Sequence, residues 1–134
     1  MIVLDASVIL KWIWKNEPRA HAARFYRDAH INGANRAAVP ELLFYEIANA
    51  LATKTQLSTE EAVEEFSVIV DAELDSYNLS QDAFSEAIRL SKQFKISLYD
   101  SSYIALASFL ECDFVTADAQ LAAKLKSLRF VKSL

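Results

Sequence analysis

Short apolar runs alternate with longer segments of helical periodicity along the whole chain, and this alternation is what most constrains the fold. The runs are too short for helices and have the length and residue types of buried strands. They cover residues 1–5, 37–39, 77–79, 113–116 and 129–131. Strands separated by helices form parallel sheets that are covered on both faces. The sequence therefore predicts an α/β fold with a parallel sheet of about four to five strands, flanked by helices on both faces.

Helix start signals divide the segments between these strands. Ser58 and Glu61 match a capping box, in which each side chain accepts a backbone N–H of the other residue. Pro18 and Pro40 suit the first turn of a helix. The predicted helices cover 8–15, 18–32, a segment opened by Pro40, a segment capped by Ser58, 80–94, 97–111 and 119–126. A chain of 134 residues is expected to form one domain, residues 1–134.

Composition excludes several classes of protein. No apolar run approaches the roughly 20 residues that span a bilayer. The N-terminus has no basic segment before its first apolar run, which contains Asp5, so no signal peptide is expected. The single cysteine, Cys112, cannot form an internal disulfide, and this favours a reducing, cytoplasmic compartment without membrane association. Because Gly33 is the only glycine, neither a dinucleotide fingerprint nor a P-loop is possible.

The charge of the chain is unevenly distributed. The net charge is −4, yet no basic residue lies between Lys54 and Arg89. That segment holds nine of the 18 acidic residues, so the remainder of the chain is basic overall. A polyanion could dock on the basic part. The acidic run from Glu60 to Asp75, however, is explained more simply as a solvated helix face.

Four acidic residues occupy positions that packing alone does not explain. Asp5 ends the first apolar run, and Asp118 lies two residues after the 113–116 segment. Glu46 interrupts the apolar face of its helix, and Asp100 opens an apolar helix. A buried carboxylate without a partner costs several kcal/mol or loses its charge. Four carboxylates brought together would repel one another, and a bound divalent cation is the natural remedy.

Three of these acids also have a structural explanation. Asp100 follows Ser97 by three residues and could be the acidic member of a capping box. Asp118 could be a simple N-cap, and Glu46 could pair with a buried arginine. If the acids bind a metal, oxygen ligands favour Mg²⁺ or Mn²⁺. The two histidines, His21 and His30, are expected on the surface of a polar helix, and the chain offers too few ligands for zinc.

The acidic residues lie in four segments that resemble the motifs of PIN-domain ribonucleases, and among these the VapC-type toxins of toxin–antitoxin pairs. The resemblance covers nearly the whole chain. Its segments are Ile2–Ser7, Leu42–Leu51, Leu98–Ala107 and Phe114–Asp118.

The resemblance implies a PIN-like three-layer fold and a metal-dependent endoribonuclease activity. The four acids would hold one or two Mg²⁺ or Mn²⁺ ions, which activate water against an RNA phosphodiester. The products would carry 5′-phosphate and 3′-hydroxyl ends. Ser7 and Thr116 would orient the carboxylates, although capping of local backbone amides explains these hydroxyls equally well.

Trp12 and Trp14 lie on a predicted helix, residues 8–15, that is apolar almost all round. One face must enter the core, and the other would be left for a partner. Alternatively, both tryptophans pack in the core. The resemblance implies a groove for an antitoxin peptide at this helix and a homodimer interface elsewhere.

Three functions remain open at the level of the sequence. The leading one is an endoribonuclease acting as a toxin. The second is a PIN-domain nuclease that processes RNA and is not a toxin. The third is a non-catalytic module that binds RNA or protein.

Overall fold

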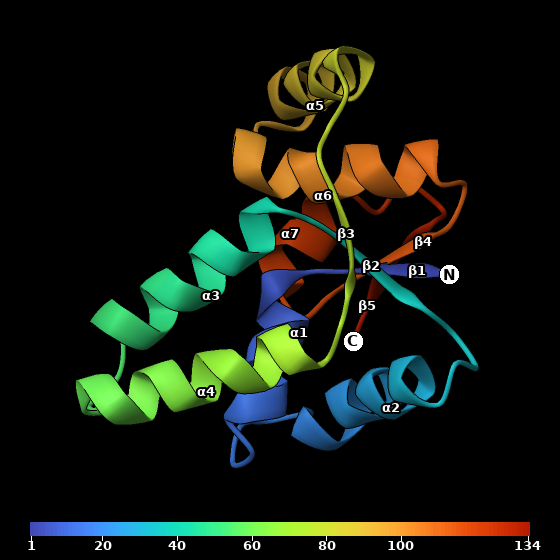
Figure 1. Cartoon of the computed structure of the whole chain (residues 1–134). Helices are drawn as coiled ribbons and strands as arrows, with labels where there is room; N and C mark the ends of the chain where they lie inside the picture. Colours follow the sequence, from blue (N-terminus) through green and yellow to red (C-terminus); the bar gives the residue numbers. More distant parts are fainter.

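Five short strands form one wholly parallel sheet in the computed structural model, which describes all 134 residues (Figure 1). The strands are β1 (Ile2–Leu4), β2 (Ala37–Pro40), β3 (Asp75–Tyr77), β4 (Asp113–Thr116) and β5 (Val131–Ser133). Their order across the sheet is β3-β2-β1-β4-β5. The α/β fold with a parallel sheet is therefore confirmed.

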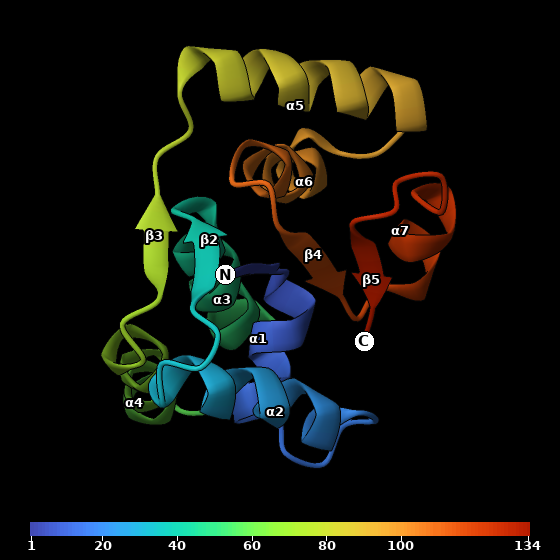
Figure 2. The ribbon, with the colours of Figure 1, turned by 90° about the vertical axis from the view of Figure 1, so that its right-hand side faces the viewer.

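Seven helices surround the sheet. They are α1 (Ala6–Ile13), α2 (Ala20–Ile31), α3 (Leu42–Thr53), α4 (Thr59–Asp71), α5 (Gln81–Phe94), α6 (Leu98–Phe109) and α7 (Ala119–Lys124). In both ribbon views α6 lies against one side of the strands with α5 stacked outside it, whereas α2 and α4 lie on the opposite side (Figures 1 and 2). The layers are thus helix, sheet and helix, as expected. No helix is long and apolar enough to cross a membrane.

The strand order places a change of direction between β1 and β4. From β1 the chain moves outward to β2 and β3, and α5 and α6 then carry it back across the sheet to β4 and β5. Leu4 at the end of β1 pairs with Val115 of β4. Ligands of open α/β sheets bind beside such a reversal, at the carboxyl ends of the strands. Residues that follow β1 and β4 are therefore well placed for a site.

The first helix is an element of the core. Trp12 is only 4% exposed, and its indole N–H donates to the carbonyl of Ala23 on α2 at 2.9 Å. Burial of the ring and satisfaction of its one polar atom explain why this position is aromatic. The expectation that Trp12 presents an exposed face to a partner is therefore wrong. Trp14, just past the end of α1, is partly exposed.

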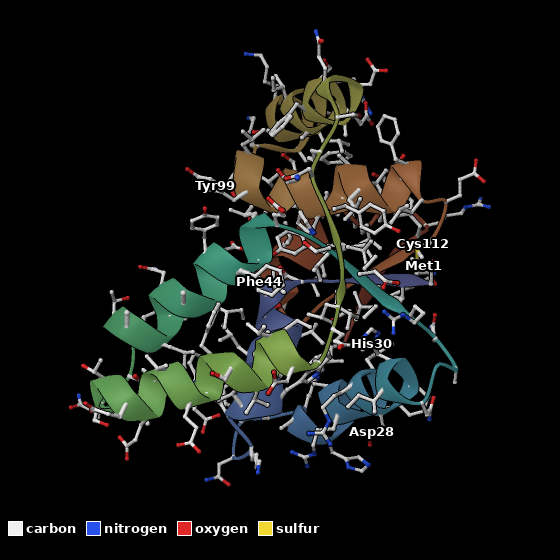
Figure 3. All side chains as sticks on the ribbon, in the orientation of Figure 1. Met1, Asp28, His30, Phe44, Tyr99 and Cys112 are labelled. Carbon is white, nitrogen blue, oxygen red and sulfur yellow. The ribbon has the colours of Figure 1, made fainter.

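His30 is also buried, which corrects the surface position expected for it. It is 1% exposed and lies between α2 and the sheet (Figure 3). Its Nδ1 accepts the backbone N–H of Ala37 at 3.0 Å, so Nε2 carries the proton that is donated to the carbonyl of Ala72 at 2.8 Å. One imidazole thus ties α2 to the start of β2 and to the end of α4. His21 is exposed, as expected.

Two strand boundaries differ from the predicted ones because pairing with the neighbouring strand fixes them. β3 covers 75–77 rather than 77–79, in register with residues 38–40 of β2. The guanidinium of Arg36 pairs with the Asp75 carboxylate and holds this register. The last strand covers 131–133 rather than 129–131. By contrast, the capping box of Ser58 and Glu61 is confirmed, with its two reciprocal bonds at 2.7 and 3.2 Å.

Candidate active site

Asp5 stands at the carboxyl end of β1 and is only 6% exposed. Its Oδ2 accepts hydrogen bonds from the Ser7 hydroxyl at 2.5 Å and from the Thr116 hydroxyl at 2.6 Å. Burial raises the pKa of Asp5, and these two hydroxyls offset part of that effect. The carboxylate is at the N-cap of α1, yet its side chain makes no capping bond there. It is therefore held by two hydroxyls instead of by the helix.

The sequence left open whether Ser7 and Thr116 orient the Asp5 carboxylate or cap backbone amides, and both hydroxyls do both. Besides donating to Asp5, the Thr116 hydroxyl accepts the backbone N–H of Asp118 at 3.0 Å. The Ser7 hydroxyl similarly accepts the backbone N–H of Ala117 at 3.0 Å. These bonds link the loop after β4 to the end of β1. The two hydroxyls thus orient Asp5 and fix the path of the chain that leads to Asp118.

Glu46 reaches the same edge of the sheet from α3. Its Oε2 accepts a hydrogen bond from the hydroxyl of Tyr103, on α6, so its partner is a phenol and not the arginine considered above. Burial, with smaller contributions from Asp5 and Asp100, raises the pKa of Glu46 to about 7. Burial, followed by the Glu46 carboxylate and smaller effects of Asp5 and Asp100, raises the pKa of Tyr103, which stays a neutral donor. Tyr103 was not among the site residues predicted from the sequence, although it follows Asp100 by three residues and so shares a face of α6 with it.

Asp100 and Asp118, at the starts of α6 and α7, complete the set of four acids. The side chain of Ser97 accepts the backbone N–H of Asp100 at 3.0 Å, which is one half of the capping box considered above. Asp118 is the N-cap of α7, because its Oδ1 accepts the N–H groups of Gln120 and Leu121 at 2.9 and 3.0 Å. The capping explanation therefore holds for Asp118, but it occupies only one of the two carboxylate oxygens.

In the structure, Asp100 lies within electrostatic range of each of the other three acids. Asp100 raises the pKa of Asp5 and of Glu46, and Asp118 in turn raises the pKa of Asp100, after the larger effect of burial in each case. Two lysines oppose this repulsion: Lys54 lowers the pKa of Glu46, and Lys124 lowers that of Asp100.

The four acids do not close around a single point. No group of three or more Asp, Glu, His or Cys side chains stands in an arrangement that could hold a metal ion. The donor set nevertheless fits a hard divalent cation, because it consists of carboxylate oxygens alone and its negative charges are unpaired by any arginine. A cation would relieve the repulsion that, after burial, adds to the rise of these pKa values.

A comparison with known families shows to which family this chain belongs. The sequence profile described as PIN domain matches residues 2–126. The chain belongs to the PIN domain family. This PIN domain gives no significant match among curated proteins.

Several solved structures share the fold of this PIN domain. A toxin–antitoxin complex from Klebsiella pneumoniae aligns with a TM-score of 0.71 at 13% identity, over 98% of this chain and 96% of that one. The VapBC2 complex of Rickettsia felis, bound to a DNA fragment from its promoter, aligns with a TM-score of 0.73 at 13% identity, over 100% of this chain and 99% of that one. The Mycobacterium tuberculosis toxin VapC20, which cleaves the sarcin–ricin loop, aligns with a TM-score of 0.67 at 12% identity, over 92% of this chain and 94% of that one. The expected PIN fold, with VapC-type toxins among the proteins that share it, is therefore confirmed.

Proposed function

We propose that this protein is a divalent-metal-dependent endoribonuclease, and that Asp5, Glu46, Asp100 and Asp118 form its active site. The observation that carries the proposal is that Asp100 lies within electrostatic range of the other three acids. Two of these acids follow the carboxyl ends of β1 and β4, where the strand order reverses. Membership of the PIN domain family supports it.

The proposed metal is Mg²⁺ or Mn²⁺. When bound, it would lower the pKa of a water molecule and stabilise the charge that develops on the phosphodiester. The chain supplies the remaining parts. Ser7 and Thr116 keep Asp5 in one orientation. Lys54, within electrostatic range of Glu46, and Lys124, within range of Asp100, offer positive charge to the phosphates of a bound RNA strand.

The proposed biological role is that of the toxin in a toxin–antitoxin pair, acting on RNA in the cytoplasm. The support is the fold, which this chain shares over nearly its full length with components of toxin–antitoxin complexes from two bacteria. A cognate antitoxin is accordingly the proposed protein partner. Since Trp12 is buried, the contribution of the first helix to that contact is reduced to Trp14 and its surroundings.

A homodimer is proposed as the form of the protein in solution. Exposed apolar side chains gather around a pocket of about 280 Å³ between the starts of α3, α5 and α6. Tyr45, Phe84 and Tyr99 are 77%, 48% and 61% exposed and all line it; Tyr99 projects from the first turn of α6 (Figure 3). Contiguous exposed aromatic surface is typical of protein interfaces. A second copy of the chain is the proposed occupant of this surface.

The nuclease activity is tested with two aspartates that bracket β4. Asp118 follows the carboxyl end of the strand, whereas Asp113 begins it and is exposed at the opposite edge of the sheet. Single-stranded RNA is incubated with the protein and Mn²⁺ or Mg²⁺, with and without EDTA, and the product ends are analysed. Asp118→Asn is expected to abolish cleavage, Asp113→Asn to retain it, and the products to carry 5′-phosphates. Cleavage that persists in EDTA would reject the metal-dependent mechanism.

The role as a toxin is tested separately, in living cells. Expression of the chain in a bacterial host is expected to arrest growth, and Asp118→Asn to relieve the arrest. Cleavage of RNA in vitro without any effect on growth would favour an RNA-processing nuclease over a toxin.

A further inference from the structure

Tyr103 has no polar contact other than the one it makes with the acidic site. It is fully buried in α6, and its ring packs against Phe114 of β4 with 6.2 Å between ring centroids. Its hydroxyl makes a single hydrogen bond, to Oε2 of Glu46 on α3. The same hydroxyl lies within electrostatic range of Asp5 and Asp100. A core residue on one helix thus holds an acid that comes from another helix.

Because Tyr103 is packed in the core, its hydroxyl can hold the flexible side chain of Glu46 in one position. Glu46 has three side-chain torsions before its carboxylate, and ordering such a side chain costs about 1.5–2 kcal/mol in rotamer freedom. The phenol ring cannot move without disturbing the core, so its hydroxyl defines one position for Oε2. The second oxygen, Oε1, accepts no hydrogen bond from the protein and is free for another ligand.

The chemical type of the donor matters as much as its position. A lysine or arginine in place of Tyr103 would orient Glu46 but would also neutralise it, and would compete with a cation for the carboxylate. A phenol is a neutral donor and leaves the negative charge in place. The contact therefore combines orientation of Glu46 with preservation of its charge, as a metal ligand requires.

We propose that Tyr103 is a positioning residue of the acidic site, whose hydroxyl fixes Glu46 so that Oε1 of the carboxylate is presented to a divalent cation. This inference rests on the proposed metal-dependent function. It assigns to Tyr103 a role in metal binding and in catalytic rate, exerted through Glu46 alone.

The direct test is removal of one oxygen atom. Tyr103→Phe keeps the ring, and Mn²⁺ affinity is measured by isothermal titration calorimetry on the wild-type protein, on this variant and on Tyr26→Phe. Tyr26 is a partly buried tyrosine of α2 and serves as the matched control. Loss of a group that orients a metal ligand commonly lowers affinity by about 10–100-fold. We expect that loss for Tyr103→Phe, none for Tyr26→Phe, and a lower kcat with an unchanged KM for RNA.

A double-mutant cycle separates positioning from a purely structural effect. Glu46→Gln is expected to weaken Mn²⁺ binding, and adding Tyr103→Phe to it is expected to weaken binding no further, because the hydroxyl then has no carboxylate to position. Mn²⁺ affinity of Tyr103→Phe within twofold of the wild type would overturn the inference, as would additive losses in the double variant. A wild-type protein that binds no Mn²⁺ would instead reject the proposed function and this inference with it.

Discussion

The hydroxyl of Thr116 donates to Asp5 Oδ2 across 2.6 Å and thereby joins the carboxyl ends of β1 and β4. The two residues are 111 positions apart in sequence, and both are buried. The same hydroxyl accepts the N–H of Asp118 at 3.0 Å, so one side chain contacts two of the four acids of the proposed site. The geometry at the carboxyl ends of β1 and β4, where the strand order reverses, therefore depends on this threonine.

Thr116→Val keeps the shape of the side chain and removes both of these bonds. It is expected to reduce RNA cleavage by about 10-fold or more, the usual effect of losing a group that orients a ligand. It should also lower the free energy of unfolding by about 1–3 kcal/mol, because the Asp118 N–H loses its partner. Thr53→Val, which removes an exposed hydroxyl on α3, is the control. Equal cleavage by the two variants would contradict the role given to Thr116.

Asp100→Asn is expected to abolish cleavage and yet to stabilise the metal-free protein. Asp100 is the acid within range of all the others, so loss of its charge relieves repulsion on Asp5 and Glu46 together. The melting temperature in EDTA should rise, whereas the further rise caused by Mn²⁺ in the wild type should shrink. A fall of the melting temperature in EDTA would show that Asp100 is chiefly structural.

The metal-free protein should lose stability as the pH rises from about 4.5 to about 7. The pKa of Glu46 is raised from 4.5 to about 7 in the folded state, so over this interval the folded chain binds a proton that the unfolded chain has released. Stability falls with pH wherever the folded state binds more protons. Urea unfolding in EDTA across this range measures the effect. Glu46→Gln should flatten the slope, and Glu64→Gln, an exposed change on α4, should leave it intact.

His30→Leu is expected to destabilise the protein strongly. The substitution leaves the Ala37 N–H and the Ala72 carbonyl without the partners that the imidazole provides. Each buried group left unpaired costs about 1–3 kcal/mol. His21→Leu, on the exposed side of the same helix, should change stability little. Denaturant unfolding of both variants at pH 7.5 makes the comparison, and similar midpoints would exclude a structural role for His30.

Tyr99→Glu is expected to convert a homodimer into a monomer. The substitution places a charge in the aromatic surface around the 280 Å³ pocket, where a second copy would otherwise bury it. Phe25→Glu is a fair control because Phe25 is a 70% exposed aromatic residue on α2. Sedimentation velocity distinguishes the two species. Dimers that persist in Tyr99→Glu would place the interface elsewhere.

The strands and helices were largely predictable because local signals define them. The apolar run before Asp5, the capping box at Ser58 and the Ser97 cap each depend on residues within one turn. The boundaries of β3 and β5 were not predictable in this way, since they follow from pairing with β2 and β4. Local sequence therefore specified the elements, and the sheet specified where two of them end.

The acids could be proposed from sequence because each one breaks an apolar pattern, but their partners could not. Tyr103 looks like an ordinary core aromatic residue until the Glu46 carboxylate is placed against its hydroxyl. Trp12 and His30 were misjudged for the related reason that burial depends on the neighbouring helix or strand, here Ala23 on α2 and Ala37 on β2. Such contacts between distant segments have no local signature.

The order of the strands has a consequence for the timing of folding during translation. β1 lies in the middle of the sheet, yet its partner β4 comes more than 100 residues later, as the pairing of Leu4 with Val115 shows. Contacts of such long sequence separation form late. A nascent chain therefore carries Asp5 and Glu46 well before Asp100 and Asp118 have been synthesised. For the nuclease proposed here, the active site cannot form until the ribosome has translated the message past Asp118.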